Sequence, residues 1–212
     1  MAIAAGPDAV QRLSRTLIQL NIATRPHHGE ADQPWLDLMG PGVDRAHYLA
    51  LLLLVYGFEA PLDSAFRYTP NLSSLVDLRS RTRTGLLAQD LMRLGMTASQ
   101  IAQLPQRFMT FSSAAEALGW MYVVERATLV QGSARRHLLQ RHPDLVNATT
   151  YLEAYDGITS LRWSELGSAF DAVTTAPSVT RQLIRAATDG FRAMRDWFHA
   201  MIPTQLDHLI AT

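Results

Sequence analysis

The chain has 212 residues, of which 48% are hydrophobic and 18% are charged. This composition is typical of a globular protein with one well-filled core, and it excludes an intrinsically disordered chain. Nineteen basic and nineteen acidic residues leave a formal net charge of zero, so nothing in the charge favours a nucleic-acid partner. The chain contains no cysteine, which excludes disulfides, thiolate metal sites and a cysteine nucleophile.

The most apolar stretch of the chain lies between Asp44 and Glu59. It is about 13 residues long, which is too short to cross a bilayer and is typical of a buried helix. The first ten residues lack the charged and apolar regions of a signal peptide. We therefore expect a cytoplasmic protein with no membrane partner.

The hydrophobic residues recur at helical spacing along nearly the whole chain. Val10, Leu13 and Leu17 begin such a stripe, which is followed by a Pro- and Gly-rich loop at Gln33–Val43. Capping residues and breakers then divide the rest. The predicted helices span residues 8–27, 44–66, 73–94, 97–103, 112–141, 147–155, 160–173 and 177–200.

The predicted caps support these boundaries. Asp44 and Thr97 precede two of the helices, and Ser112 or Ser113 precedes the longest one. Pro177 stands at a favourable first-turn position. No alternating strand pattern, internal repeat or linker is present. The sequence predicts an all-α protein, a compact helical bundle in which residues 1–212 form a single domain.

The string from Leu20 to His28, followed by Asp32, resembles the start of the biliverdin-producing heme oxygenases. In that family an Ala-Thr-basic-x-x-His stretch ends in the histidine that binds heme iron. Counting from Thr24 places this ligand at His28, with His27 as a solvated neighbour. Arg25 matches a basic residue that pairs with a heme propionate, and Asp32 lies one helical turn after His28.

Three further segments resemble the same family in the same order. Tyr48–Leu62 is similar to its second conserved helix, and Trp163–Phe170 with Pro177–Phe198 match its closing helices in spacing. Residues 118–138 are similar to the bacterial pattern Tyr-Val-x-Glu-Gly-Ser-Thr-Leu-Gly-Gly followed by Arg-His-Leu. The chain is thus identified as a heme oxygenase-like protein of bacterial type, similar to those associated with bacteriophytochromes.

The resemblance implies a definite chemistry. Heme would be bound through a neutral histidine and cleaved with O₂ to biliverdin, iron and carbon monoxide. An electron-donor protein or small reductant would supply electrons, and a phytochrome would be one acceptor of the product. Monomer and homodimer both remain open.

The segment facing the open side of the heme departs from the family pattern. The family uses glycines there because helix backbone must approach iron-bound oxygen closely. Here Arg126 replaces the first glycine, Ala127 replaces a polar residue, and Val130 and Gln131 replace the paired glycines. Such bulk either moves the helix back or fills the oxygen side. In a displaced register, Gly132 would be the close-approach residue instead.

The resemblance assigns roles to individual residues. Arg126 and Gln131 are predicted to act on the oxygen side, where Arg126 either reaches over the heme or pairs with Glu125, Glu116 or another carboxylate. His28 is the predicted iron ligand. The remaining residues predicted to line the heme are Thr24, Arg25, Asp32, Tyr122, Ala127, Val130, Phe191 and Phe198.

Two other classes compete with the heme oxygenase hypothesis. A family member impaired in catalysis would bind heme, a bile pigment or another ligand as a carrier, sensor or partner, and the four replacements favour it. Thiaminase-like enzymes and di-iron oxidases share the bundle fold. The former generally need a cysteine, and the latter need Glu-x-x-His pairs; the sequence contains neither.

Overall fold

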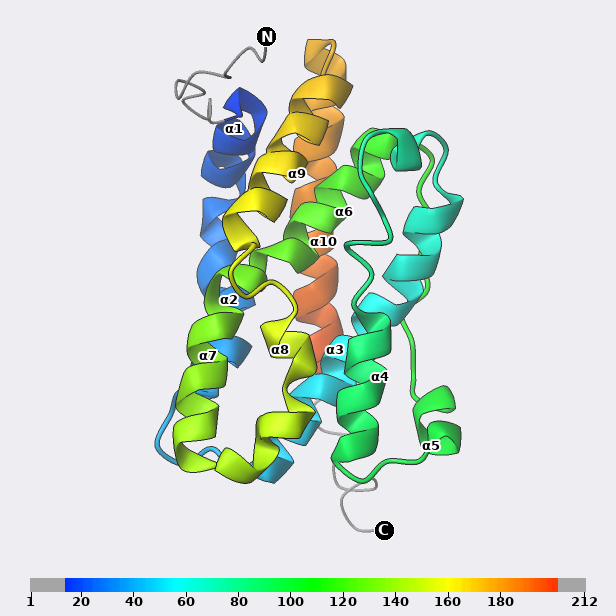
Figure 1. Ribbon diagram of the computed structural model, residues 1–212. Coiled ribbons are helices and arrows are strands. Elements are labelled where there is room, and N and C mark those ends of the chain that lie inside the picture. The colour runs from blue at the N-terminus through cyan, green and yellow to red at the C-terminus, as the bar shows by residue number, and fades with distance from the viewer. Residues whose placement is uncertain (1–13, 202–212) are drawn as a thin grey trace, which may run out of the picture.

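The computed structural model describes residues 14–201, and over this range the chain is helical with no strand. The prediction of an all-α fold is confirmed. Figure 1 shows α6 crossing in front of α10 at the centre, with α1, α2 and α7 along one side and α4 and α5 on the other. The α-helices are α1 Arg15–Thr24, α2 His28–Asp37, α3 Arg45–Tyr68, α4 Thr84–Arg93, α5 Ala98–Ala102, α6 Ala114–Arg126, α7 Thr128–Arg141, α8 Thr150–Glu153, α9 Thr159–Val173 and α10 Pro177–Met201.

Side-chain caps fix several helix starts where the sequence predicted them. Asp44 accepts a hydrogen bond from the His47 amide at the start of α3. Thr97 and Gln100 form a reciprocal capping box at α5, and Ser113 caps α6. These bonds satisfy amide groups that the first helical turn leaves without partners, so each cap determines where its helix begins.

The centre of the bundle depends on a close approach of α6 to α10. A Cβ atom at Gly119 would lie 2.6 Å from the Leu183 carbonyl oxygen and 2.8 Å from the Ala186 Cβ atom. Only glycine lets the two backbones meet at this distance. The contact holds together an apolar core that includes Phe58, Tyr122 and Phe191.

Helix α3 is the most apolar element. It is long and apolar enough by composition to cross a membrane, but 61% of its most apolar window is buried inside the protein. Tyr48 and Phe58 on this helix are almost fully buried, and the Tyr48 hydroxyl donates to the Ala148 carbonyl at 2.9 Å. These contacts are those of a central core helix.

Three predicted helices were wrong in part. The stretch predicted at 73–94 is helical only from Thr84: the 3₁₀ segment Leu72–Ser74 is followed by a turn in which Asp77 accepts hydrogen bonds from the Arg79 amide and the Ser80 hydroxyl. The long helix predicted to end at 141 breaks at Ala127 into α6 and α7. The helix predicted at 147–155 is shortened to α8.

The first predicted helix also differs from the observed one. Helix α1 ends at Thr24, a 3₁₀ turn covers Arg25–His27, and α2 continues to Asp37 into the predicted loop. Pro26 within the 3₁₀ turn has no amide hydrogen for a continuous α-helix. The predicted part at residues 8–13 lies outside the described residues.

Candidate functional site

The turn between α1 and α2 places His28 against the interior. The Thr24 hydroxyl donates to the Leu20 carbonyl at 2.8 Å, one helical turn back. This bond uses the Thr24 proton, and it leaves the oxygen facing the His28 side chain as an acceptor. His28 begins α2, and only 9% of its surface is exposed.

Two hydroxyl groups and one aromatic ring surround the His28 imidazole. Its Nε2 atom lies 3.0 Å from Thr24 Oγ1 and 3.3 Å from the Tyr122 hydroxyl oxygen of α6. The Phe191 ring of α10 is tilted against it, with centroids 5.7 Å apart. Thr24, His28, Tyr122 and Phe191, all predicted from the sequence to belong to one site, therefore do lie together.

The His28 imidazole is neutral near pH 7. Burial and, to a smaller extent, the nearby positive charge of Arg126 together lower its pKa from 6.5 to about 4, while Asp32 opposes the shift. A neutral imidazole retains the nitrogen lone pair that a metal ion requires.

A second contact joins the same two helices one turn further on. The Arg126 Nη2 atom lies 2.6 Å from Asp32 Oδ2, and the two side chains are only 14% and 16% exposed. Of the two interpretations of Arg126, the structure shows the ion pair, and the partner is Asp32 rather than Glu125 or Glu116. Both residues were predicted site residues.

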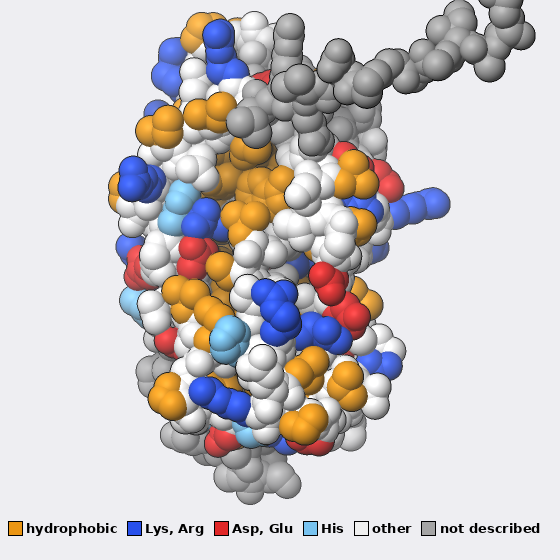
Figure 2. Space-filling model, turned by 60° about the vertical axis from the view of Figure 1, so that its left-hand side comes forward, with side chains coloured by type: hydrophobic (Ala, Val, Ile, Leu, Met, Phe, Trp, Pro, Cys, Tyr) orange, Lys and Arg blue, Asp and Glu red, His pale blue; other side chains and the backbone are white. Residues whose placement is uncertain are grey.

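The remaining space between α2, α3, α6 and α10 is a narrow apolar cleft. Its volume is about 10 Å³, room for at most one water molecule. In Figure 2 the side of the molecule bearing α1, α2 and α7 is turned forward, and hydrophobic side chains floor a hollow on it, with Arg, His and acidic side chains at the rim. The cleft is lined by Ala31, Asp32, Trp35, Val55, Phe58, Glu59, Val123, Val124, Arg126, Ala127, Met194 and Phe198.

The chemistry of His28 suits heme iron, whereas the observed spacing of the helices leaves no room for the heme ring. His28 offers a neutral, buried nitrogen flanked by aromatic rings, as a heme iron requires. In the observed conformation, however, the Tyr122 hydroxyl lies 3.3 Å from His28 Nε2, and Arg126 bridges α2 and α6. A planar ring fits between these helices only after they separate.

The side chains of three predicted site residues take no part in the contacts around His28. The Arg25 side chain is exposed and makes no hydrogen bond or ion pair among residues 14–201, whereas the Arg25 amide donates to the Ile22 carbonyl. Val130 packs against the second apolar core. Gln131 is buried and accepts from Arg83 Nη1 at 3.1 Å, and it borders a polar cavity of about 260 Å³ between α7 and residues 152–159.

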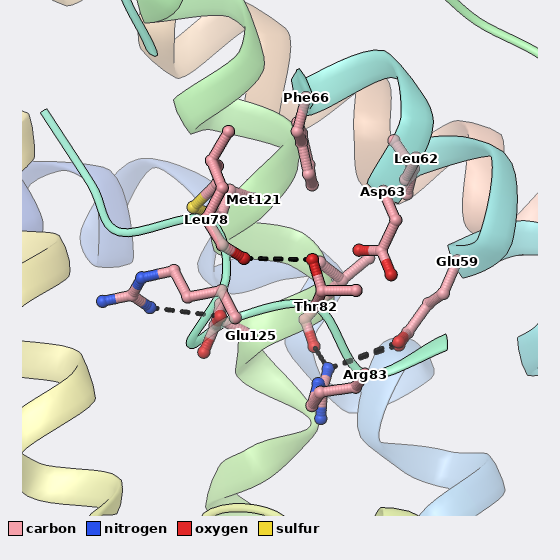
Figure 3. A pocket seen from close by; sticks show the side chains of 11 residues that line it. Glu59, Leu62, Asp63, Phe66, Leu78, Thr82, Arg83, Met121 and Glu125 are labelled. Carbon is pink, nitrogen blue, oxygen red and sulfur yellow. Dashed lines mark hydrogen bonds and ion pairs between the residues drawn. The ribbon is translucent and has the colours of Figure 1, made fainter. Parts of the chain in front are cut away.

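A buried polar cluster lies behind α6, centred on Glu59 and Arg83 (Figure 3). Arg83 Nη2 lies 3.4 Å from both Glu59 carboxylate oxygens and donates to the Val124 carbonyl at 3.2 Å. The Tyr151 hydroxyl donates to Glu59 at 2.7 Å. Burial raises the pKa of Glu59 to about 7, although Arg83 opposes this shift.

A second ion pair completes this cluster. Arg81 Nη1 lies 3.1 Å from Glu125 Oε1, and the Tyr155 hydroxyl donates to the same carboxylate at 2.7 Å. The cavity that they border has a volume of about 20 Å³, enough for roughly one water molecule. Among the described residues, no three His, Asp or Glu side chains converge in a way that could hold a metal ion.

The sequence analysis missed two residues around His28: Asn21 Nδ2 donates to the Tyr122 hydroxyl at 3.5 Å, and Trp163 packs edge-on against Tyr122. His27, expected to be a solvated neighbour, is half-buried and stacks on Phe191. Asn21, Thr24 and His28 are spaced by three and four, so their shared helix face could have been recognised. Nothing in the local sequence marks Trp163, which arrives from α9.

These helices have the arrangement of the heme oxygenase fold. The chain is similar to the crystallised heme oxygenase from Neisseria meningitidis studied with bound NO and CO, with a TM-score of 0.68 and 19% identity over 86% of this chain and 89% of that one. The family model described as "Heme oxygenase" matches residues 14–200. The chain therefore belongs to the heme oxygenase family. No curated protein matches it.

Proposed function

We propose that the protein binds heme with the His28 Nε2 atom as the iron ligand. The observation that carries this proposal is the neutral, buried His28 imidazole between Phe191 and Tyr122 at the start of α2. Neutral imidazole is the common protein ligand for heme iron. The family of the chain supports heme as its ligand.

The reaction that this proposal favours is heme oxygenation. Heme, when bound, supplies the oxygen chemistry by which its own ring is cleaved to biliverdin, iron and carbon monoxide, with O₂ and external electrons consumed. Phe191 holds the His28 ring in place by its tilted contact. The hydroxyl groups of Thr24 and Tyr122 would orient the His28 Nε2 atom until heme iron binds to it.

A hemin titration tests the ligand. Wild-type protein should develop a Soret band with a stoichiometry of one hemin per chain, and His28→Ala should lose it or show a shifted, weaker band. His27→Ala is the matched control, because it removes the neighbouring ring, which stacks on Phe191, and leaves the Thr24 and Tyr122 contacts of His28 in place. An unchanged spectrum in His28→Ala would refute His28 as the ligand.

Adding ascorbate or a reductase system to the hemin complex tests the reaction. Loss of the Soret band with appearance of biliverdin absorbance is the expected result. The same solution can be assayed for carbon monoxide and ferrous iron, which separates enzymatic cleavage from simple bleaching of the heme.

A second function is favoured by one specific observation. Arg126, which the sequence resemblance aligns with a family glycine, is ion-paired with Asp32, and Ala127 and Phe198 line the same cleft. A protein that binds heme or a bile pigment without turnover, as carrier, sensor or partner, would have no need for close approach to bound oxygen. A stable Soret band in the presence of reductant and O₂ would establish this function instead.

The other predictions stay predictions. They concern heme contacts by Arg25 and Val130, a role on the oxygen side for Arg126 and Gln131, an electron donor, a phytochrome acceptor, a cytoplasmic location and the oligomeric state. Arg25 lies on the exposed side of the turn before His28 and would reach a propionate only at the surface. Gln131 would reach the heme only if it released Arg83.

A further inference from the structure

Two polar contacts join α2 to α6 in register. His28 meets Tyr122 at 3.3 Å, and Asp32 meets Arg126 at 2.6 Å. The two residues of α2 are four apart, and so are the two residues of α6, so each pair lies one helical turn from the other. The two contacts therefore join α2 to α6 at positions one full helical turn apart on each helix.

Any planar ligand bound through His28 must separate both contacts. The ligating atom has to replace the Tyr122 hydroxyl beside Nε2, and the ring has to pass where the Arg126 side chain reaches α2. The cleft of about 10 Å³ leaves no room for it otherwise. The ion pair is the stronger of the two contacts, because it is short, charged and largely shielded from water.

We infer that the Arg126–Asp32 ion pair is a latch that holds α2 closed over the His28 site, so that heme binds only after the pair has opened. This inference rests on the proposed function. The buried Nε of Arg126 has no hydrogen-bond partner among the described residues, so the contact with Asp32 is made by Nη2.

Little else ties α2 down by charge. The other ion pair of α2 within residues 14–201 joins Glu30 to His199 at 3.8 Å, and both side chains are well exposed. Exposed pairs of this kind contribute little, whereas a shielded pair costs much more to break. Removing the latch should therefore shift α2 toward the open position without unfolding the bundle.

Stopped-flow mixing with hemin tests the latch. Because only the open fraction of the protein can bind, the observed rate for wild-type protein should level off at high hemin concentration. Arg126→Ala and Asp32→Asn should each raise that limiting rate by about tenfold or more. Arg135→Ala is the matched control, because it removes an ion pair of 2.9 Å that joins α7 to α8 instead, and its rate should equal that of wild type.

The result that would overturn the latch is a limiting rate in both Arg126→Ala and Asp32→Asn equal to or below that of wild type. Circular dichroism and thermal unfolding of each variant establish that the bundle is intact before mixing. Arg126→Gln, which keeps a shorter polar side chain without the charge, should behave like Arg126→Ala if the ion pair is responsible.

Hydrogen exchange in the absence of hemin separates the latch from the proposed function. Amides of α2 should exchange about tenfold faster in Arg126→Ala than in wild type or Arg135→Ala, because the open state is more populated. Equal exchange in all three proteins would refute the latch. If no variant binds hemin but exchange rises as expected, the proposed function fails, and what stands is that the ion pair holds α2 closed.

Discussion

Replacing Arg83 by methionine should destabilise the fold far more than a typical surface change. Arg83 is 4% exposed and lies with its guanidinium carbon 4.8 Å from the Tyr151 ring centroid. Methionine keeps much of the length of the side chain but removes the charge. Glu59 would then be left buried without its cation.

The expected loss follows from the partners that lose their donor. Removing one member of a buried ion pair costs about 3–5 kcal/mol, because the other charge stays uncompensated. Gln131 Oε1 and the Val124 carbonyl also lose hydrogen bonds. For a protein of this size, 3–5 kcal/mol corresponds to a fall in Tm of roughly 6–20 °C.

Urea unfolding at two pH values measures both the loss and its cause. At pH 5 Glu59 can bind a proton in the folded variant, which removes the unpaired charge, whereas at pH 8 that proton must be taken from a more dilute pool. Arg83→Met should therefore be more destabilised relative to wild type at pH 8 than at pH 5. Glu59→Leu combined with Arg83→Met should recover part of the loss, with a coupling energy of about 2 kcal/mol.

Two results would contradict this reasoning. A loss below about 1 kcal/mol in Arg83→Met would mean that the pair is solvated or not formed. Equal losses in Arg83→Met and in the double variant would mean that Arg83 acts through packing against Tyr151 and not through Glu59.

Three further predictions concern other parts of the structure. The free energy of unfolding of wild type should fall as the pH rises from about 5 to 7. The pKa of Glu59 is about 7 in the fold and near 4.5 in the unfolded chain, so the unfolded state loses its proton first, and Glu59→Gln should flatten this part of the curve. Gly119→Ala should lower stability by about 1–3 kcal/mol in denaturant unfolding, since its Cβ atom would overlap α10 at 2.6 Å, whereas Gly29→Ala, where nothing lies within 4 Å, should have no such cost. Trp163→Phe should cost about 1 kcal/mol by losing the 3.1 Å hydrogen bond to Thr128, and an unchanged midpoint would show that the bond has no net value.

The fold was predictable where local chemistry decides it. Asp44, Thr97 and Ser113 mark helix starts through bonds to amides three residues away, and such signals are visible in the sequence. The error at residues 73–83 has the opposite cause. Arg81 and Arg83 point inward to Glu125 and Glu59, and these long-range ion pairs hold the segment out of the helical conformation that its apolar spacing suggested.

The candidate site was predictable in part for the same reason. Thr24 and His28 lie one turn apart, so their contact follows from helical spacing. The partner of Arg126 does not follow from spacing, because Asp32 is 94 residues away and several carboxylates were equally eligible. The closed cleft likewise depends on how α2 and α6 meet in space.

The 3₁₀ turn Arg25–His27 precedes α2, so a tilt of α2 about this turn moves each residue further the further it lies from the turn. A helix that pivots at its first residue carries its far end furthest, and seven residues at 1.5 Å each place Trp35 about 10 Å from His28 along the axis. A tilt of α2 about this turn therefore moves the indole several times further than the imidazole. The histidine can keep its alignment with Phe191 while Trp35 leaves the Tyr151 ring, 6.1 Å away, and its fluorescence would report that displacement.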